Sequence, residues 1–277
     1  MTWIAWLDGK QRLNQWKKKS GNQFKTGYVE FDNVRIYYEE YGTGDPLLLL
    51  HGGGGDCRSW MFQIPEFAKH FRVIAPDTRA HGRSTDNLEK PLSYYLFAED
   101  WVKLLDHLNI ERTHVVGWSD GGCTILALGI NHSDRLNKIV PGGTPYHTDN
   151  YHPGILDASL GPEQWATSPT IKRMKKSYQA VAPNPNQWET FLKRLFGDMF
   201  YREPNFSLEA ISTIQSEMLV IIGEKEEFFP LRHSEILTQS VPNGELLVIP
   251  GATHWAFMEK PKIFNEAVIN FVRKVKK

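Results

Sequence analysis

The 277-residue chain contains little cysteine, no net charge and no apolar run long enough to cross a membrane. Its two cysteines, Cys57 and Cys123, are too few for a disulfide framework, and their spacing suggests no metal site. We therefore expect reduced thiols, a cytoplasmic location and no integral membrane segment. The N-terminal stretch also lacks a secretory apolar region, because Asp8 and Lys10 interrupt it.

The balance of charges limits the kinds of partner. Lysine plus arginine total 32 and aspartate plus glutamate total 32, so no overall field attracts nucleic acid or an anionic membrane. Hydrophobic residues make up 41% of the chain, which suffices for one large core. We expect a single domain with an insertion, no cofactor, no nucleic acid, and a small molecule as the partner.

Residues 1–26 are expected to form a helical extension ahead of the first strand. Apolar residues recur along one side of this basic, amphipathic segment, at Trp3, Ile4, Leu7, Leu13 and Trp16. Such a helix could pack on its own domain, rest on a lipid surface or contact a partner subunit. Packing on its own domain is the favoured interpretation. A homo-oligomer formed through this helix, or through the cap described below, is left open.

Short apolar segments predict a largely parallel sheet. From Gly27, two segments that alternate as strands do, GYVEF and VRIYYEEYG, predict an antiparallel ribbon. Mostly apolar runs, typical of parallel strands covered by helices on both faces, follow at residues 46–50, 72–77, 113–118, 218–223 and 245–250. The segment NKIV at 137–140 should add another strand.

Helical patterns separate these strands. In SYYLFAEDWVKLLDHLN, apolar residues recur at roughly helical spacing, which predicts a crossover helix between two parallel strands. Residues 144–212 contain further helical segments rich in aromatic and basic residues. We expect an α/β fold in which residues 27–143 and 213–277 form a mostly parallel sheet flanked by helices. Residues 144–212 should form a helical cap inserted over the carboxyl edge of that sheet.

The segment VVGWSDGG at 115–122 places one serine at the end of an expected strand. Gly117 and Gly121 flank Ser119 at the spacing Gly-x-Ser-x-Gly. This spacing lets a strand and a helix approach closely around a strained serine. Ser119 is therefore a candidate nucleophile.

Other reactive groups follow the neighbouring strands, where ligands bind in open parallel sheets. The runs described above lead into an HGGGG loop, into Ser119, into the acidic segment EKEE and into GATH, which ends at His254. A hydroxyl, a carboxylate and an imidazole are thus expected at one edge of the sheet, in the chain order nucleophile, acid, base.

These groups suit acyl transfer. A serine hydroxyl is a poor nucleophile until its proton is removed, and an imidazole, here that of His254, is the usual base that receives that proton. A carboxylate fixes the imidazole tautomer and stabilises the imidazolium. Two backbone N–H groups, of Gly53 and Asp120, are expected to stabilise the developing oxyanion.

The motifs HGGGG, APDTRAHGRS, GWSDGG, GEKEEFFP and GATHWAFMEKP together resemble the serine-nucleophile α/β-hydrolase superfamily. The resemblance runs from about Gly27 to the C-terminus and is to esterase/lipase-like members, including valacyclovir hydrolase-like and bacterial carboxylesterase-like ones. It implies a triad of Ser119, Glu226 and His254, with Gly53 and Asp120 lining the oxyanion hole. It also implies a substrate pocket between sheet and cap, and no cofactor or metal.

The acid departs from the pattern of the superfamily, whose acid is most often aspartate three residues past the strand-ending glycine. Here Gly223 plus three gives Glu226, which carries the same charge on a longer arm. Glu227 beside it is an alternative, and Asp149 beyond the preceding strand is a second one. Glu226 is favoured.

Several residues near the serine allow two interpretations each. The Asp120 carboxylate could pair with a cationic substrate group or cap the following helix, and capping is favoured. Trp118 could line the pocket or pack in the core, with lining slightly favoured. Gly54 and Trp255 are further candidates for the pocket wall. His51 is expected to bond the loop backbone.

The sequence thus predicts a cofactor-independent serine hydrolase of small to medium carboxylic esters, amino-acid esters and lactones included. Water should resolve the acyl-enzyme. One alternative is a carbon-carbon bond hydrolase or a perhydrolase that uses the same triad. Another is a receptor-like ligand-binding protein on the same fold, with little turnover.

Overall fold

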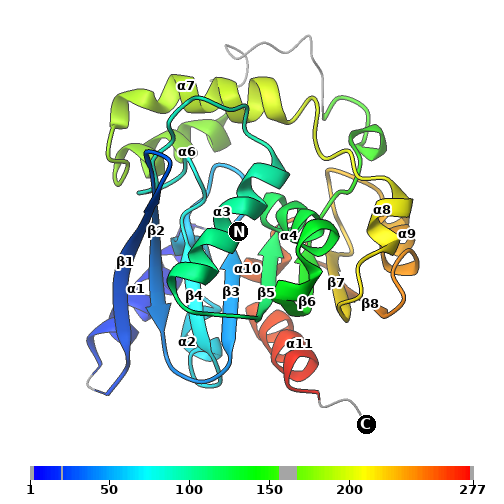
Figure 1. The fold of residues 1–277 in the computed structure, drawn as a ribbon, viewed down its shortest axis with the longest axis horizontal. Helices are drawn as coiled ribbons and strands as arrows, with labels where there is room; N and C mark the ends of the chain where they lie inside the picture. The colour runs from blue at the N-terminus through cyan, green and yellow to red at the C-terminus, as the bar shows by residue number, and fades with distance from the viewer. Residues whose placement is uncertain (1–2, 20, 156–166, 275–277) are drawn as a thin grey trace.

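The computed structural model describes residues 3–19, 21–155 and 167–274 (Figure 1), with only the backbone described for residues 3–8, 10 and 150. Statements below refer to these residues. No helix among them is both long and apolar enough to span a membrane. The part of the expected cap at residues 156–166 lies outside this description.

The described residues form an eight-stranded sheet in the order β1-β2-β4-β3-β5-β6-β7-β8. Strands β1 and β2 pair antiparallel, as do β2 and β4, and the remaining neighbours pair parallel. The strands are β1 (Phe24–Phe31), β2 (Val34–Tyr41), β3 (Pro46–Leu50), β4 (Arg72–Pro76), β5 (Thr113–Trp118), β6 (Leu136–Gly142), β7 (Met218–Gly223) and β8 (Gly244–Ile249). The predicted α/β class with a mostly parallel sheet is confirmed, although β1 begins at Phe24 and not at Gly27.

The continuous apolar strands are explained by a core on each face of the sheet. In β3, Leu48 and Leu50 belong to one core, and Leu47 and Leu49 belong to the other. Alternate side chains of a strand point to opposite faces, so a strand covered on both sides must be apolar throughout.

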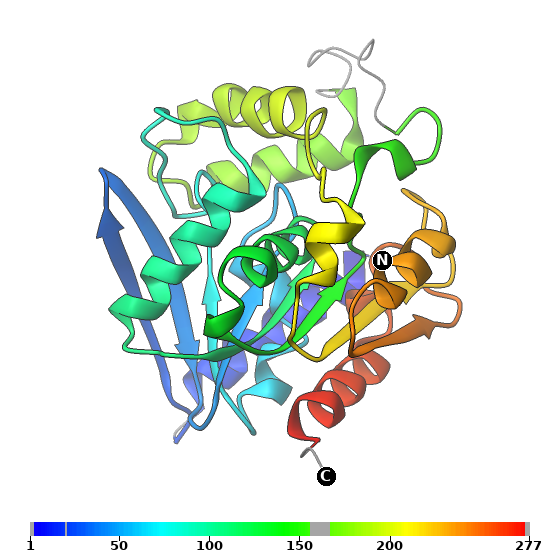
Figure 2. The same cartoon turned by 45° about the vertical axis from the view of Figure 1, so that its right-hand side comes forward.

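Helices cover both faces (Figures 1 and 2). One face carries α3 (Tyr94–His107), α4 (Asp120–Asn131), α8 (Leu208–Ser212) and α9 (Leu231–Gln239). The opposite face carries α1 (Trp3–Lys18), α2 (Ile64–Phe67), α10 (Ala256–Glu259) and α11 (Pro261–Arg273). Short 3₁₀ turns lie between β3 and α2 (η1, Cys57–Trp60), between α4 and β6 (η2, Ser133–Arg135) and after β6 (η3, Thr148–Asn150).

The N-terminal helix α1 packs on the sheet of its own domain. Leu13 is buried in the same core as α2 and α11, and the Trp16 ring meets the Tyr41 ring edge-on. Lys17 Nζ lies 2.9 Å from a carboxylate oxygen of the buried Glu39. The side chains of Trp3, Ile4 and Leu7, expected on the same apolar side, lie outside the described part of the chain.

Helices after β6 lie over the carboxyl ends of the parallel strands (Figure 2). They are α6 (Pro169–Gln179), the 3₁₀ turn η4 (Pro185–Gln187), α7 (Trp188–Leu192) and the π-helix η5 (Lys193–Met199). Aromatic side chains hold them together, since the Tyr178 and Phe191 rings stack 5.2 Å apart and Trp188 packs against both. Below, the word cap refers to residues 167–206, which fall within the expected insertion at residues 144–212.

Candidate active site

Ser119 occupies a strained turn between β5 and α4. Its φ of 55° and ψ of −117° are unusual for a residue with a side chain. The flanking glycines are required by close approach, because a Cβ on Gly117 would lie 2.4 Å from the Gly121 carbonyl oxygen. A Cβ on Gly121 would lie 2.0 Å from the Leu50 carbonyl oxygen. This geometry is that of a nucleophile elbow, in which a strand and a helix meet around an outward-facing hydroxyl.

His254 lies in the loop after β8, against the carboxylate that follows β7. Its Nδ1 is 2.9 Å and 2.8 Å from the two carboxylate oxygens of Glu226, and both side chains are buried. Because Nδ1 faces the carboxylate, Nε2 is the nitrogen available to accept a proton. The Trp118 indole N–H donates to the His254 carbonyl at 2.8 Å, which ties this loop to the residue before Ser119.

The two alternative acids occupy different positions. Glu227 accepts a hydrogen bond of 2.8 Å from the backbone N–H of His254 and so holds the loop. The Asp149 side chain is 86% exposed and lies 3.6 Å from His147. Of the three carboxylates, Glu226 is therefore the one that the structure places on the imidazole.

The HGGGG loop lies beside Ser119. A Cβ on Gly52 would be 3.3 Å from the Ser119 Cβ, and a Cβ on Gly53 would be 2.2 Å from Asp120 Oδ2. His51 holds the loop, because its Nε2 accepts from the Thr78 N–H at 2.9 Å and its Nδ1–H donates to the Gly52 carbonyl at 2.8 Å. As the first residue of α4, Asp120 has a backbone N–H without an intrahelical acceptor.

The hydrogen bonding of the Asp120 carboxylate disagrees with the interpretation favoured from the sequence, in which it caps the following helix. Its Oδ1 accepts from the Tyr94 hydroxyl at 3.1 Å, and its buried Oδ2 has no hydrogen-bond partner among the described residues. Burial raises the pKa of the Asp120 carboxyl from 3.8 to about 7, against the lowering effect of the Tyr94 hydrogen bond. The side chain lies beside Gly53 in the first turn of α4, and its hydrogen bond among the described residues is the one from Tyr94 and not one from a helix N–H.

Of the remaining residues predicted to line the pocket, two lie near the cap or the solvent and one is packed in the core. Gly54 lies under the cap, since a Cβ there would be 2.7 Å from the sulfur of Met174 in α6, and Trp255 is 37% exposed next to the His254 ring. Trp118 is 1% exposed, with its ring 4.8 Å from that of Phe257, which corresponds to core packing and not to the favoured pocket wall.

Two residues at this site belong to no motif that the sequence analysis singled out. Tyr94 lies in the expected crossover helix, and its backbone N–H donates to the cap residue Glu203 at 2.7 Å while its hydroxyl reaches Asp120. Met174 brings the cap onto Gly54. Neither position could be found from spacing, because each depends on how the cap and α3 dock on the sheet.

The motif APDTRAHGRS forms a structural cluster of charged residues. Asp77 accepts from Arg83 Nη1 at 3.0 Å and from the Cys57 backbone N–H at 2.8 Å. Asp56, Cys57 and Asp77 lie close enough to hold a metal ion, but Arg58 and Arg83 already bond the two carboxylates. We assign these groups to loop structure.

Comparison with known proteins agrees with this geometry. A family model for the alpha/beta hydrolase fold matches residues 45–167 and 156–261, which is most of the chain. The chain belongs to the alpha/beta hydrolase fold family. Its relatives in this family are hydrolases of several kinds.

Three similar proteins of this family have more specific names. A putative carbamate hydrolase, RutD, from Caulobacter is 28% identical over 86% of this chain and 95% of the relative. A 2-hydroxy-6-oxononadienedioate/2-hydroxy-6-oxononatrienedioate hydrolase from Burkholderia vietnamiensis is 29% identical over 87% of this chain and 92% of the relative. The solved structure of Est816, an N-acyl homoserine lactone degrading enzyme, is 28% identical, with a TM-score of 0.70 over 88% of this chain and 100% of that chain.

Proposed function

We propose that this alpha/beta hydrolase family member cleaves small to medium carboxylic esters through an acyl-enzyme. In the proposed reaction Ser119 Oγ attacks the ester carbonyl while His254 Nε2 takes the hydroxyl proton. Glu226 holds the imidazole at Nδ1 and stabilises the imidazolium. The observation that carries this proposal is the 2.8 Å contact between Glu226 Oε2 and His254 Nδ1, in a loop bonded to the strained elbow.

The charge that develops on the ester oxygen is stabilised, in this proposal, by the backbone N–H groups of Gly53 and Asp120. The His51 hydrogen bonds hold the loop in place before substrate binds, so little reorganisation accompanies the reaction. Loss of one such donor costs on the order of 3 kcal/mol in the barrier. The protonated His254 then gives its proton to the leaving alcohol, and a water activated by the same imidazole releases the acid.

The proposal is tested by the time course of p-nitrophenyl acetate hydrolysis. A burst of p-nitrophenol that matches the enzyme concentration, followed by steady turnover, is expected for an acyl-enzyme that water resolves. A burst without turnover would instead favour the receptor-like alternative, and no release above the background rate would contradict both.

A second candidate, carbon-carbon bond hydrolysis, is supported by the name of the Burkholderia relative. The substrate in that name is a dicarboxylate. In this chain the half-buried Glu203 carboxylate lies near the buried Asp120 carboxyl, and each of them, when ionised, would repel an anionic substrate group beside it. We therefore expect a 2-hydroxy-6-oxo-dienedioate to be turned over less efficiently than a neutral ester. The opposite order in kcat/KM would favour the second candidate.

We further propose that Asp120 selects esters with a cationic group. Its Oδ2 is buried, has no hydrogen-bond partner among the described residues and lies beside Gly53 at the proposed oxyanion hole. A buried carboxylate is costly, and a substrate cation held nearby would stabilise its negative charge by electrostatic attraction, without a hydrogen bond. Binding of the cation would also favour the ionised carboxylate over the neutral acid.

Asp120→Asn should therefore reduce kcat/KM for a trimethylammonioacetate ester much more than for the isosteric 3,3-dimethylbutanoate ester. A buried charge pair that loses one partner costs roughly 2 to 5 kcal/mol, so the difference should exceed about tenfold at pH 8. The backbone N–H of residue 120 is kept in the variant, so the proposed oxyanion hole is unchanged.

The same pair of esters tests the pH dependence. The Asp120 carboxyl has a pKa of about 7, so it is neutral below that pH and charged above it. In the wild type, the preference for the cationic ester should rise as the pH increases through about 7. In Asp120→Asn the preference should stay constant with pH. Equal losses on both esters, or a constant preference in the wild type, would refute the selection of cations and leave the proposed triad intact.

A further inference from the structure

Two cap side chains lie on the glycine loop at the proposed oxyanion hole. A Cβ on Gly53 would be 3.0 Å from Cζ of Phe200, and a Cβ on Gly54 would be 2.7 Å from the sulfur of Met174. Both side chains pack against the core cluster that contains α3 and α4, yet both remain partly exposed. A molecule bound at the loop can therefore contact them, which the fully buried core residues do not allow.

The Phe200 ring is held in place within the cap. The Phe196 ring lies edge-on to it, with ring centroids 4.9 Å apart. The Phe200 backbone N–H donates to the Leu195 carbonyl oxygen at 3.1 Å, five residues back, as in a π-helix. In an α-helix the acceptor would be Phe196, so the π-turn changes the direction in which the Phe200 side chain leaves the helix. Such turns are rare and occur frequently at functional sites.

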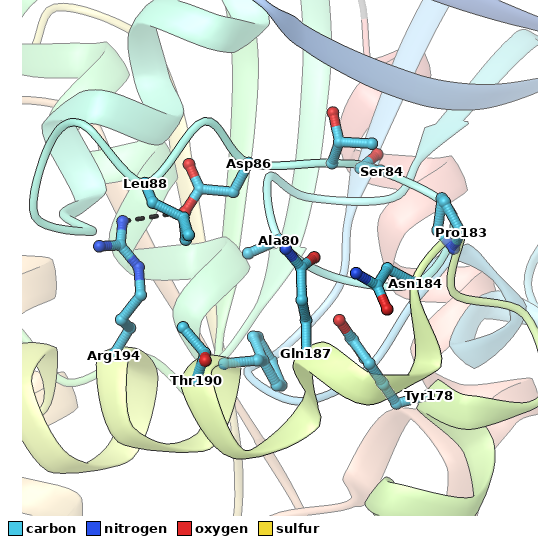
Figure 3. Close-up of a pocket in the computed structure, with 12 residues that line it drawn as sticks. Ala80, Ser84, Asp86, Leu88, Tyr178, Pro183, Asn184, Gln187, Thr190 and Arg194 are labelled. Atoms are coloured by element: carbon cyan, nitrogen blue, oxygen red, sulfur yellow. Dashed lines mark hydrogen bonds and ion pairs between the residues drawn. The ribbon is translucent and has the colours of Figure 1, made fainter.

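The chain is also bonded to the core on both sides of Phe200. On the N-terminal side, Arg194 Nη2 donates to Asp86 Oδ2 at 2.9 Å (Figure 3). On the C-terminal side, Glu203 accepts from the Tyr94 backbone N–H at 2.7 Å. Hydrogen bonds to ionised groups are stronger than neutral ones. Phe200 is therefore part of a fixed wall, which cannot move aside for a larger substrate without loss of one of these bonds.

The strand order decides which part of an ester meets Phe200. The glycine loop follows β3 and His254 follows β8, so the two lie on opposite sides of Ser119, which follows β5. In the proposed mechanism the leaving alcohol lies beside His254 Nε2, from which it takes a proton. The ester oxygen lies at the backbone N–H groups of Gly53 and Asp120. The acyl chain then extends away from His254, over the loop and toward the cap side chains.

We propose that Phe200 limits the length of the acyl group, so that the substrates are esters of short acyl chains. The inference rests on the proposed ester hydrolysis and narrows it to one substrate class. A straight chain that continues past its first few carbons would meet the ring, and a packed site that must accept extra methylene groups forces side chains out of their rotamers. Met174 is unbranched and can adapt its shape, so it should limit the chain less.

The test compares p-nitrophenyl acetate, butanoate and octanoate, which share one leaving group and differ only in the acyl chain. In the wild type, kcat/KM for the octanoate should be at least about tenfold below that for the acetate. In Phe200→Ala the ratio of octanoate to acetate should rise at least about tenfold, because the ring that blocks the chain is gone. Phe200→Trp enlarges the ring and should lower the ratio of butanoate to acetate.

Phe62→Ala is the matched control. Phe62 is also partly buried, but it packs against the opposite core cluster, beside Gly9 of α1. Removal of its ring should leave both ratios as in the wild type. Thermal unfolding checks that each variant is folded. If Phe200→Ala does not fold, Phe200→Leu, which keeps an apolar side chain but removes the ring, carries the same expectation.

The outcomes separate this inference from the proposed function. If the wild type cleaves the acetate but its chain-length profile is unchanged in the shortened Phe200 variant, the inference is overturned and the proposed hydrolysis stands. An equal rise in Phe62→Ala would also overturn it, because general loosening of the fold would then explain the change. If the wild type cleaves none of the three esters, the proposed function and this inference both fail.

Discussion

Ser119→Ala should abolish ester hydrolysis while the protein remains folded. In the proposed mechanism the Ser119 hydroxyl is the atom that forms the acyl-enzyme, and His254 and Glu226 act only through it. Removal of a triad nucleophile therefore lowers kcat by about a millionfold and leaves only the contribution of the oxyanion hole and of binding. The measurement is kcat for p-nitrophenyl acetate with the purified variant.

The folded state should hardly change in this variant. Ser119 is half-buried, and the strain of its φ belongs to the turn and is kept by alanine. The free energy of unfolding should shift by less than about 1 kcal/mol. Ser212→Ala is the matched control, because Ser212 is exposed in α8 and its hydroxyl bonds only the local Glu209 carbonyl in the described structure. A Ser119→Ala enzyme with near wild-type kcat would contradict the proposed nucleophile.

Glu226→Gln should have the second-largest effect and should separate the two neighbouring glutamates. A neutral amide cannot stabilise the imidazolium, and its N–H₂ group can select the wrong imidazole tautomer. The loss in kcat should be about ten-thousandfold, by analogy with the same change in other triads. Binding of ester should change far less, because the carboxylate contacts His254 and not the proposed substrate position.

Glu227→Gln is the comparison for this variant. Glu227 accepts from the His254 backbone N–H, and a glutamine oxygen can accept the same bond. The loss should stay below about tenfold, since one neutral hydrogen bond is worth about 1 kcal/mol. If Glu227→Gln were the more damaging change, the acid would be assigned to residue 227. If only Asp149→Asn inactivated the enzyme, the acid would belong to the segment after β6.

The sheet could be predicted from the sequence because its pattern is local. Runs such as PLLLL are apolar at every position, which a strand requires only when both of its faces are covered. The first residue of β1 was harder to predict from the sequence. Phe24, Lys25 and Thr26 pair with β2 although their side chains are exposed, so no apolar alternation marks them.

The candidate site was predictable to the extent that its residues follow strands directly. Ser119 and the segments that contain Glu226 and His254 all come after apolar runs, and parallel strands end at one edge. The Asp120 side chain was not predictable in this way. Its direction depends on Tyr94, which lies 26 positions earlier, and on the missing Cβ of Gly53.

Trp118 illustrates the same limit. Successive strand residues point to opposite faces, so a residue next to the nucleophile can lie in the core and not in the pocket. Trp118 lies in the core because its ring packs against those of Phe257 and Phe264, two residues that come after β8 in the sequence. The substrate pocket has the same difficulty, because Gly54 meets the cap through Met174.

The most direct test of the proposed mechanism is the site of covalent labelling by a fluorophosphonate, located by peptide mass spectrometry. The proposal predicts one adduct per chain, on Ser119, formed much more slowly in His254→Ala because the base is missing. An adduct on another residue, or labelling of Ser119 at an unchanged rate in His254→Ala, would contradict the assignment of Ser119 and His254 as nucleophile and base.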